Sequence, residues 1–363
     1  TLSVEEINSP EPGDNEIVLS VKAASLNFFD TLIIERKYQY RPELPFSPAA
    51  EVSGVVKSAG ANVTRFKPGD RAMAYLGWGG AREEVAVDEN KAVAIPDAID
   101  HPSASGLTVT YGTTLHALRD RADLRPGETL AILGASGGVG QAAIEIGKTM
   151  GARVIACASS DDKLEFCAQL GADELVNYAN TDLKEALKQL SGGKGIDCIY
   201  DPVGGDFTEP AFRAMGWGGR YLVIGFAAGA IPKLPLNLVL LKGCQVVGVF
   251  WGEHVAREPD KHRANMQTLL DWCAAGKIRP HIHKTYSLEE TVEALQAIAR
   301  REINRKFTSV LIFVGYNLIF GFTQTGIDNA AHLGGFATGL LMGALLIWSQ
   351  PAPGGLSRRP RYA

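Results

Sequence analysis

Short apolar runs bounded by proline and glycine dominate the first hundred residues of the chain. Ile17–Ala23 and Glu51–Val56 are rich in valine and other apolar residues, and a Pro-Gly turn follows at Lys67–Asp70. Runs of this length between turn residues are typical of β-strands. We therefore predict a β-rich N-terminal region.

From about Gly106 the pattern changes to short apolar runs that alternate with helical periodicity. The runs are Thr129–Leu133, Arg153–Cys157, Glu174–Val176, Ile196–Tyr200, Tyr221–Ile224 and Gln245–Phe250. Such alternation predicts a doubly wound parallel sheet, so the fold class is α/β. A further helix is expected over Leu288–Arg300, where Ser287 and Glu290 form a capping box.

The last part of the chain has a different pattern. Asp328 is the only formally charged residue between Phe307 and Trp348, and the apolar stretches on its two sides, 307–322 and 330–348, would span roughly 24 and 28 Å as helices. We predict an apolar helical hairpin over 307–348, able to associate with a membrane, and a flexible tail over 349–363. The alternative is that 305–314 adds a final strand and the rest is a soluble extension.

Composition narrows the classes of function. The chain has 363 residues, enough for two domains, and its net charge of −4 gives no basic surface for nucleic acid. Its five cysteines are scattered and never spaced as C-x-x-C, so neither a disulfide framework nor a zinc ribbon is expected. The first residues lack the features of a signal peptide. We expect a cytoplasmic protein that the hairpin can tether to a membrane.

A glycine-rich turn follows the apolar strand Thr129–Leu133. It reads Gly134-Ala-Ser-Gly-Gly-Val-Gly140 and precedes a helical pattern. A dinucleotide pyrophosphate needs bare backbone N–H groups at a helix N-terminus, which Gly137, Gly138, Val139 and Gly140 would supply. The spacing is G-x-x-G-x-x-G instead of the strict dinucleotide fingerprint, so a tight turn without a ligand is the competing interpretation.

The same turn also satisfies G-x-S-x-G, the nucleophile elbow of serine hydrolases, with Ser136 as nucleophile. The histidines available for a triad are His254, His262, His281 and His283. We favour the dinucleotide interpretation because Gly140 and the second strand-helix unit serve a cofactor and have no purpose in an elbow. A protein that binds a nucleotide without turnover is a third hypothesis.

The end of the next predicted strand after the glycine turn, Arg153–Cys157, indicates which dinucleotide binds. An NAD site places an acidic residue about 20 residues after the glycines, but Ser159 and Ser160 stand there, and Asp161 is expected to cap the next helix. Lys163 can pair with a 2′-phosphate, although an exposed helix charge is an equally simple interpretation. The pattern favours NADPH.

Residues 1 to about 306 resemble a medium-chain dehydrogenase/reductase, most closely the zinc-free quinone oxidoreductase branch. The matching segments, in the family's order, are Ala24–Asp30, Gly54–Val56, Phe66–Arg71, the glycine turn, Gly171–Tyr178 and Asp201–Gly205. The resemblance implies a GroES-like catalytic domain over 1–105 and 251–306, a Rossmann domain over 106–250, bound NADPH and a homodimer.

The resemblance also assigns roles to single residues. It places Lys163 and Tyr178 at the 2′-phosphate, with Ser159, and Thr113 beside the cofactor. It adds Gly225 to the cofactor-binding residues. Asn27 and Tyr38 would face the nicotinamide and the substrate, although a surface aromatic is the alternative for Tyr38.

Zinc-dependent relatives carry a ligand cysteine and a Gly-His-Glu where this chain has Asn27 and Ala49-Ala-Glu51, and no cysteine precedes Cys157. No catalytic zinc is therefore expected. Without a Lewis acid, the substrate must accept hydride readily by itself, as a quinone or an α,β-unsaturated carbonyl does.

The segment predicted to form the hairpin resembles part of a second protein family. Gly326–Gly335, with His332, is similar to the last transmembrane helix of rhomboid proteases, in which the histidine is the general base. The helix with the nucleophilic serine has no counterpart here. We therefore expect no proteolysis and interpret the segment as the end of another protein joined to a reductase.

Overall fold

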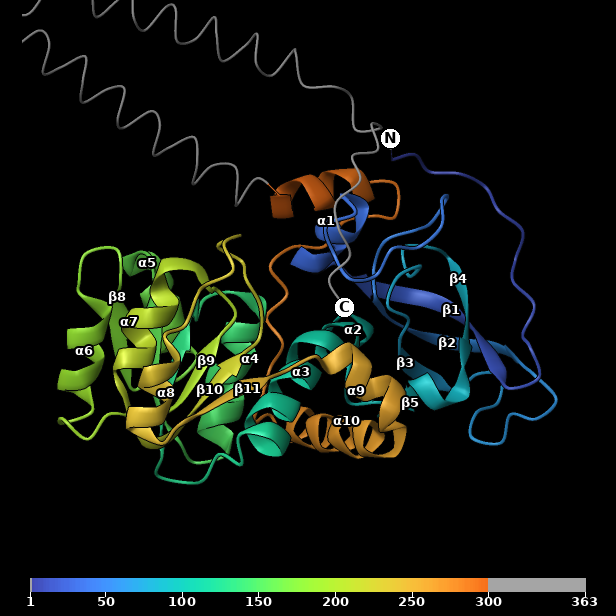
Figure 1. The fold of residues 1–363 in the computed structure, drawn as a ribbon. Coiled ribbons are helices and arrows are strands. Elements are labelled where there is room, and N and C mark those ends of the chain that lie inside the picture. Colours follow the sequence, from blue (N-terminus) through green and yellow to red (C-terminus); the bar gives the residue numbers. More distant parts are fainter. Residues whose placement is uncertain (1, 300–363) are drawn as a thin grey trace, which may run out of the picture. The chain divides into compact units, whose positions relative to one another are not determined.

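The computed structural model describes residues 2–299. The predicted hairpin over 307–348 and the tail over 349–363 lie outside the described residues. Two sheets, one antiparallel and one parallel, account for the strands of the described part (Figure 1).

The antiparallel sheet has five strands in the order β4-β1-β2-β3-β5. Their bounds are β1 Glu16–Ser25, β2 Glu51–Ala59, β3 Arg71–Tyr75, β4 Glu84–Asp88 and β5 Ala92–Ala94. Ile17, Leu19 and Val52 are fully buried in its core. Gly54 allows β1 and β2 to approach, because a Cβ there would lie 2.2 Å from the Ser20 carbonyl oxygen.

The parallel sheet has six strands in the order β11-β10-β9-β6-β7-β8. The strands are β6 Thr129–Leu133, β7 Arg153–Ala158, β8 Glu174–Asn177, β9 Ile196–Asp201, β10 Met215–Val223 and β11 Gln245–Gly248. The strand order reverses between β6 and β9. Ligands of such sheets bind beyond the carboxyl ends of the strands at that point.

Helices connect the strands of the parallel sheet. They are α4 Gly138–Thr149, α5 Asp161–Gln169, α6 Leu183–Leu190, α7 Thr208–Arg213 and α8 Leu236–Lys242, with a 3₁₀ turn at Gly205–Phe207. Alanine and glycine let α4 pack closely on the sheet: a Cβ on Gly147 would lie 2.8 Å from a Leu130 methyl group. The doubly wound parallel sheet that the sequence predicts is confirmed.

The remaining helices come from both halves of the chain. They are α1 Phe28–Ile34, α2 His101–Gly106, α3 Gly112–Leu115, α9 Trp251–Arg257 and α10 Pro259–Ala274, with a 3₁₀ turn at Glu89–Lys91 and π turns at Leu107–Tyr111 and His116–Arg121. Gly112 of α3 allows close packing, since a Cβ there would lie 2.8 Å from both Met266 and Trp251. Met266, Leu269 and Leu270 of α10 share one buried cluster with residues of both predicted domains. The exact domain boundaries therefore remain a proposal.

Three local expectations differ from the structure. β10 begins at Met215 instead of Tyr221, and its pairing with β9 is irregular between Met215 and Arg220, where three glycines occur. The last helix covers 291–299, although the backbone N–H of Ser287 does donate to Glu290 at 2.8 Å. Ser160 is the N-cap of α5, whereas Asp161 accepts a hydrogen bond from Asn177 at 2.7 Å.

Candidate active site

The glycine turn between β6 and α4 is shaped for a close ligand. Gly134 has a φ of +59°, a conformation that favours glycine, and the exposed Gly137 is the N-cap of α4. A Cβ on Gly140 would lie 2.5 Å from the carbonyl oxygen of Gly134. The first N–H groups of a helix lack partners within the helix, so this turn can hold an anion.

Ser136 does not have the features of a nucleophile elbow. Its backbone is outside the strained left-handed region, and its carbonyl oxygen accepts a hydrogen bond from Gln141 at 3.0 Å. Within residues 2–299, its hydroxyl makes no hydrogen bond to a histidine. The geometry therefore gives the serine hydrolase hypothesis no support.

Ser159 directly follows β7, and Lys163 lies in the first turn of α5. Nζ of Lys163 donates to Oγ of Ser159 at 2.9 Å. The nearest acid in the sequence, Asp161, is held by Asn177 instead. A cation at this position, with a hydroxyl beside it, can bind a phosphate group.

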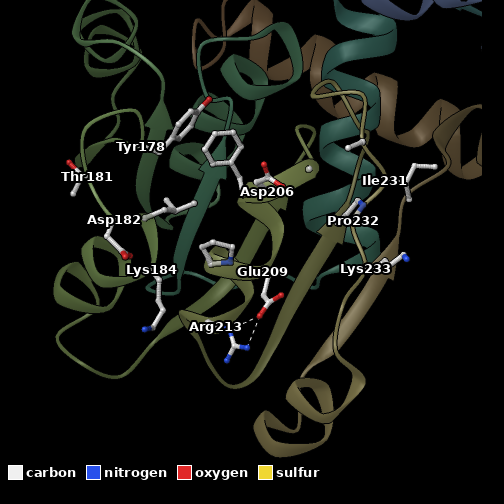
Figure 2. Close-up of a pocket in the computed structure, with 15 residues that line it drawn as sticks. Tyr178, Thr181, Asp182, Lys184, Asp206, Glu209, Arg213, Ile231, Pro232 and Lys233 are labelled. Atoms are coloured by element: carbon white, nitrogen blue, oxygen red, sulfur yellow. Dashed lines mark hydrogen bonds and ion pairs between the residues drawn. The ribbon is translucent and has the colours of Figure 1, made fainter. Parts of the chain in front are cut away.

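Tyr178 follows β8 and is held against β7, because its backbone N–H donates to the Ala158 carbonyl oxygen at 3.1 Å. Its ring packs on Phe207 with 4.4 Å between ring centroids. Both rings line an open pocket of about 800 Å³, together with Arg213 and Lys233 (Figure 2). The pocket is formed by the Rossmann part of the chain and contains neither Asn27 nor Tyr38.

Two further predicted cofactor residues lie near the carboxyl ends of the parallel strands. Thr113 is in α3, and the preceding π turn reaches the glycine turn: a Cβ on Gly138 would lie 3.3 Å from the Thr110 methyl group. The N–H of Gly225 donates to the Asp201 carbonyl oxygen at 3.3 Å, at the end of β9.

Asn27 is oriented by a buried carboxyl group. Its side-chain amide, Nδ2, donates to Oε1 of Glu51 at 2.8 Å, and the backbone N–H of Val109 donates to Oε2 at 2.6 Å. Glu51 is fully buried, and this burial raises its pKa to about 8. Glu51 thus joins Asn27 to the π turn that leads into α3.

Tyr38 belongs to a group of rings that we call the aromatic cluster: Phe29, Tyr38, Tyr40, Trp78 and Phe250. Its ring stacks on Phe29 at 5.4 Å and meets the edge of Tyr40 at 5.6 Å, while Tyr40 stacks on Phe250 at 6.1 Å. Burial, with Tyr40 and Asp30 nearby, raises the pKa of Tyr38 to about 12. Its hydroxyl is therefore neutral at pH 7 and able to donate a hydrogen bond.

Asn27 and Tyr38 stay predicted site residues, and the structure adds polar and aromatic groups around them that the sequence analysis does not include. In the sequence, Glu51 enters only at the position of the zinc motif, although a glutamate inside an apolar strand is itself a signal for a buried, hydrogen-bonded carboxyl group. Asp30 is also 1% exposed, and burial raises its pKa to about 7. Trp78 and Phe250 come from distant segments and carried no sequence signal.

Two family models match most of the described chain. One, described as the alcohol dehydrogenase GroES-like domain, matches residues 13–97, and one described as zinc-binding dehydrogenase matches residues 138–275. Quinone oxidoreductase-like protein 2 of Bos taurus is 36% identical over 306 residues, which cover 84% of this chain and 88% of that protein. The chain belongs to the medium-chain dehydrogenase/reductase family.

Other family members agree with this assignment. The quinone oxidoreductase of Pseudomonas aeruginosa is 32% identical over 301 residues, which cover 83% of this chain and 92% of that protein. The crystal structure of Escherichia coli quinone oxidoreductase complexed with NADPH has a TM-score of 0.75 at 27% identity, covering 82% of this chain and 92% of that one. The quinone oxidoreductase-like resemblance is thus confirmed, and the chain is an oxidoreductase of this family.

A third model, the rhomboid domain, matches residues 290–349. This match agrees with the second resemblance of the sequence. Among residues 2–299, no helix is long and apolar enough to cross a membrane. The predicted spans of the hairpin lie beyond these residues and stay a prediction.

Proposed function

We propose that this protein is an NADPH-dependent reductase that transfers hydride to a quinone or an α,β-unsaturated carbonyl without a catalytic metal. The observation that carries the proposal is the pairing of Lys163 with Ser159 beside a glycine turn that can hold a pyrophosphate. The relatives named as quinone oxidoreductases, and the NADPH complex of one of them, support the same function.

The residues around the turn fit NADPH. Gly137, Gly138, Val139 and Gly140 would hold the pyrophosphate, because a side chain at Gly140 would collide with the turn. Ser159, Lys163 and Tyr178 would hold the 2′-phosphate, and Thr113 and Gly225 would flank the cofactor. When bound, NADPH supplies the hydride.

On the substrate side, the chain positions hydrogen-bonding groups instead of a metal ion. Asn27 offers an amide and Ala50 offers no ligand atom, where zinc relatives carry a thiolate and an imidazole. Because Glu51 takes one N–H of Asn27 and the Asn27 side chain is part of the capping box of α1, the amide is fixed and its second N–H remains for the nicotinamide or the substrate. The neutral hydroxyl of Tyr38 would donate a hydrogen bond to the developing enolate or quinolate oxygen, and solvent would supply the proton.

A homodimer is part of the proposal. Leu236, Leu240 and Leu241 of α8 are 77%, 79% and 69% exposed, and Trp217 of β10 is 82% exposed. β11, next to β10, is an edge strand. Exposed apolar residues near an open sheet edge favour pairing with a second copy of the chain. The mass of the chain in solution, measured by light scattering, would be twice that of the monomer.

A panel of quinones, enones and simple aldehydes tests the function through the loss of NADPH absorbance. We expect turnover with quinones or enones and none with aldehydes, which need a stronger electrophilic catalyst. Binding of NADPH without turnover on any of them would favour the non-catalytic hypothesis, and hydrolysis that depends on Ser136 would favour the hydrolase.

A further inference from the structure

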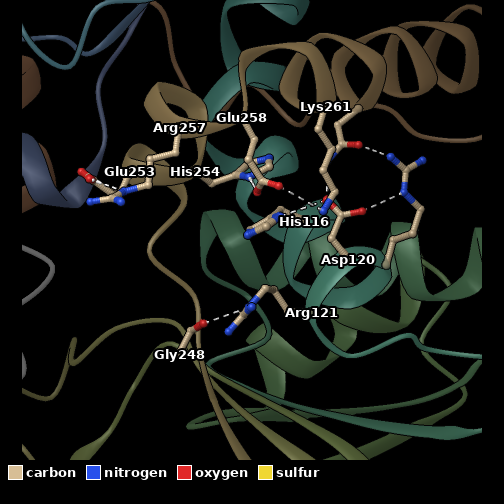
Figure 3. A network of polar contacts seen from close by, with 11 residues as sticks. His116, Asp120, Arg121, Gly248, Glu253, His254, Arg257, Glu258 and Lys261 are labelled. Carbon is tan, nitrogen blue, oxygen red and sulfur yellow. Dashed lines mark hydrogen bonds and ion pairs between the residues drawn. The ribbon is translucent and has the colours of Figure 1, made fainter.

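A buried group of histidines lies outside the site described above, where the π turn His116–Arg121 packs against α9 (Figure 3). His116 is 5% exposed and His254 is 6% exposed. Their rings are stacked with 3.8 Å between centroids and 14° between planes. One ligand-type atom from each of His116, Asp120 and His254 lies within 4.8 Å of the other two.

Each ring is held by a carboxylate one helical turn further along the chain. Nδ1 of His116 lies 2.9 Å from Oδ2 of Asp120, and Nδ1 of His254 lies 2.7 Å from Oε2 of Glu258. Carboxylates commonly hold the non-ligating nitrogen of a metal-binding histidine, as Glu258 holds Nδ1 of His254. Glu258 occupies Nδ1 of His254, so Nε2 of His254 is the nitrogen available to a metal ion. This Nε2 is buried and has no hydrogen-bond partner in the described part of the chain.

A buried nitrogen without a hydrogen-bond partner destabilises the folded state. The neighbouring His262 is 1% exposed, and neither of its ring nitrogens has a partner among residues 2–299. A buried imidazole nitrogen without a hydrogen-bond partner is the kind of group that can bind a metal ion.

We propose that His116, Asp120 and His254 bind a divalent transition-metal ion of the zinc class, at a site separate from the one for hydride transfer. Two imidazoles and a carboxylate are a ligand set that zinc accepts, with water in the fourth position. The ion ties the π turn after α3 to α9, two segments far apart in the sequence, so its role is structural.

The distances require only limited movement. Tetrahedral zinc with bonds of about 2.0–2.2 Å places two ligand atoms about 3.3–3.6 Å apart. The 2.9 Å between His116 and Asp120 therefore opens slightly as the ion replaces the proton between them. The ligand atom of His254 must also move closer, because the three ligand atoms now lie within 4.8 Å of one another. The side chain of Glu258 is 51% exposed and can follow a small shift of His254.

Two cationic side chains near Asp120, Arg119 and Lys261, compete with a metal ion at this position. Nε of Arg119 lies 3.3 Å from Oδ1 of Asp120, while the Asn265 amide donates to Oδ2 at 2.7 Å. These contacts hold the carboxylate in place. Oδ2, the atom nearest His116, faces the ion.

The test uses the full chain after exhaustive chelation. Zn²⁺ and Co²⁺ are titrated separately, and we expect one equivalent of either ion to bind, with release of a proton and a rise in Tm. Bound Co²⁺ should give a nitrogen and oxygen ligand spectrum without a thiolate band. His254→Ala and Asp120→Asn should each weaken binding at least tenfold, whereas His281→Ala, an exposed histidine, should leave it unchanged.

Two results would overturn the proposal. One is the lack of saturable binding at one equivalent, and the other is binding of the same strength in His254→Ala and Asp120→Asn as in the unmodified chain. If His254→Ala does not fold, His254→Gln keeps a polar side chain there and serves the same purpose. NADPH oxidation should persist in the metal-free chain, which separates this site from hydride transfer.

Discussion

At the scale of single residues, the proposed function depends on a few polar contacts. In the proposed function, the Lys163–Ser159 pair would select NADPH, while Glu51 fixes the amide of Asn27 from a fully buried position. The two contacts have different environments. The lysine is exposed and would contact the cofactor directly, whereas the glutamate would act through the side chain of Asn27.

Lys163→Ala should weaken NADPH binding about tenfold or more and leave NADH binding nearly unchanged, because a charge-assisted hydrogen bond is worth about 1.5–3 kcal/mol. Isothermal titration with both cofactors measures this. Lys67→Ala, at an exposed turn of the antiparallel part, should change neither affinity. Equal losses for NADPH and NADH in Lys163→Ala would refute the assignment.

Glu51 should make stability depend on pH. Its folded pKa of about 8 lies above the ordinary value of 4.5, so its contribution is fully present below pH 4.5 and is lost as pH rises through 8. Glu51→Gln removes this loss. Compared with the unmodified chain, the variant should gain more than about 1 kcal/mol in unfolding free energy between pH 5 and pH 8.5. The unfolding free energy of both proteins is measured by urea unfolding at each pH. If it depended on pH in the same way for both, the raised pKa of Glu51 would be contradicted.

At the scale of elements, the glycine turn joins the fold to the cofactor site. Gly140→Ala would place a methyl group 2.5 Å from the Gly134 carbonyl oxygen and 2.6 Å from that of Ala135. We expect α4 to shift, with a loss of about 1–3 kcal/mol in stability and at least tenfold in NADPH affinity. Gly248→Ala, where a Cβ meets nothing within 4 Å, is the matched control. Titration and thermal unfolding check both variants.

The elements were largely predictable because their hydrophobic periods are strong. The strand at Thr129–Leu133 and the glycines after it matched the structure residue by residue, since a buried parallel strand needs a continuous apolar run. The early start of β10 was missed because Met215–Gly219 has the glycine content of a turn. The stacking of Phe250 on Tyr40 had no local signal, because contacts between distant segments depend on the tertiary fold.

At the scale of the whole molecule, the prediction for the C-terminal segment concerns membrane association and not catalysis. Basic residues flank the predicted hairpin on both sides: Arg300, Arg301, Arg305 and Lys306 before it, and Arg358, Arg359 and Arg361 after it. An excess of Lys and Arg is typical of segments on the cytoplasmic side of a membrane, so both ends of the hairpin are expected on that side. The full chain should then sediment with membranes and need detergent, while a chain ending at Lys306 should stay in the supernatant. Full-length protein that is monodisperse in plain buffer would refute the hairpin.

His332→Ala gives a second test of the tail. We expect no effect on NADPH oxidation, because the residue belongs to the predicted hairpin and not to the residues proposed to bind cofactor or substrate. A loss of reductase activity in this variant would show that the tail takes part in hydride transfer.

The most direct test of metal-free hydride transfer is the steady-state rate of NADPH oxidation by a quinone, measured on the full chain before and after exhaustive chelation. We predict that the rate saturates with both NADPH and the quinone. We also predict that chelation leaves this rate unchanged, even if it removes a metal ion from His116, Asp120 and His254. Turnover that disappears with the removal of stoichiometric zinc, or NADPH binding without oxidation by any quinone or enone, would contradict the proposed function.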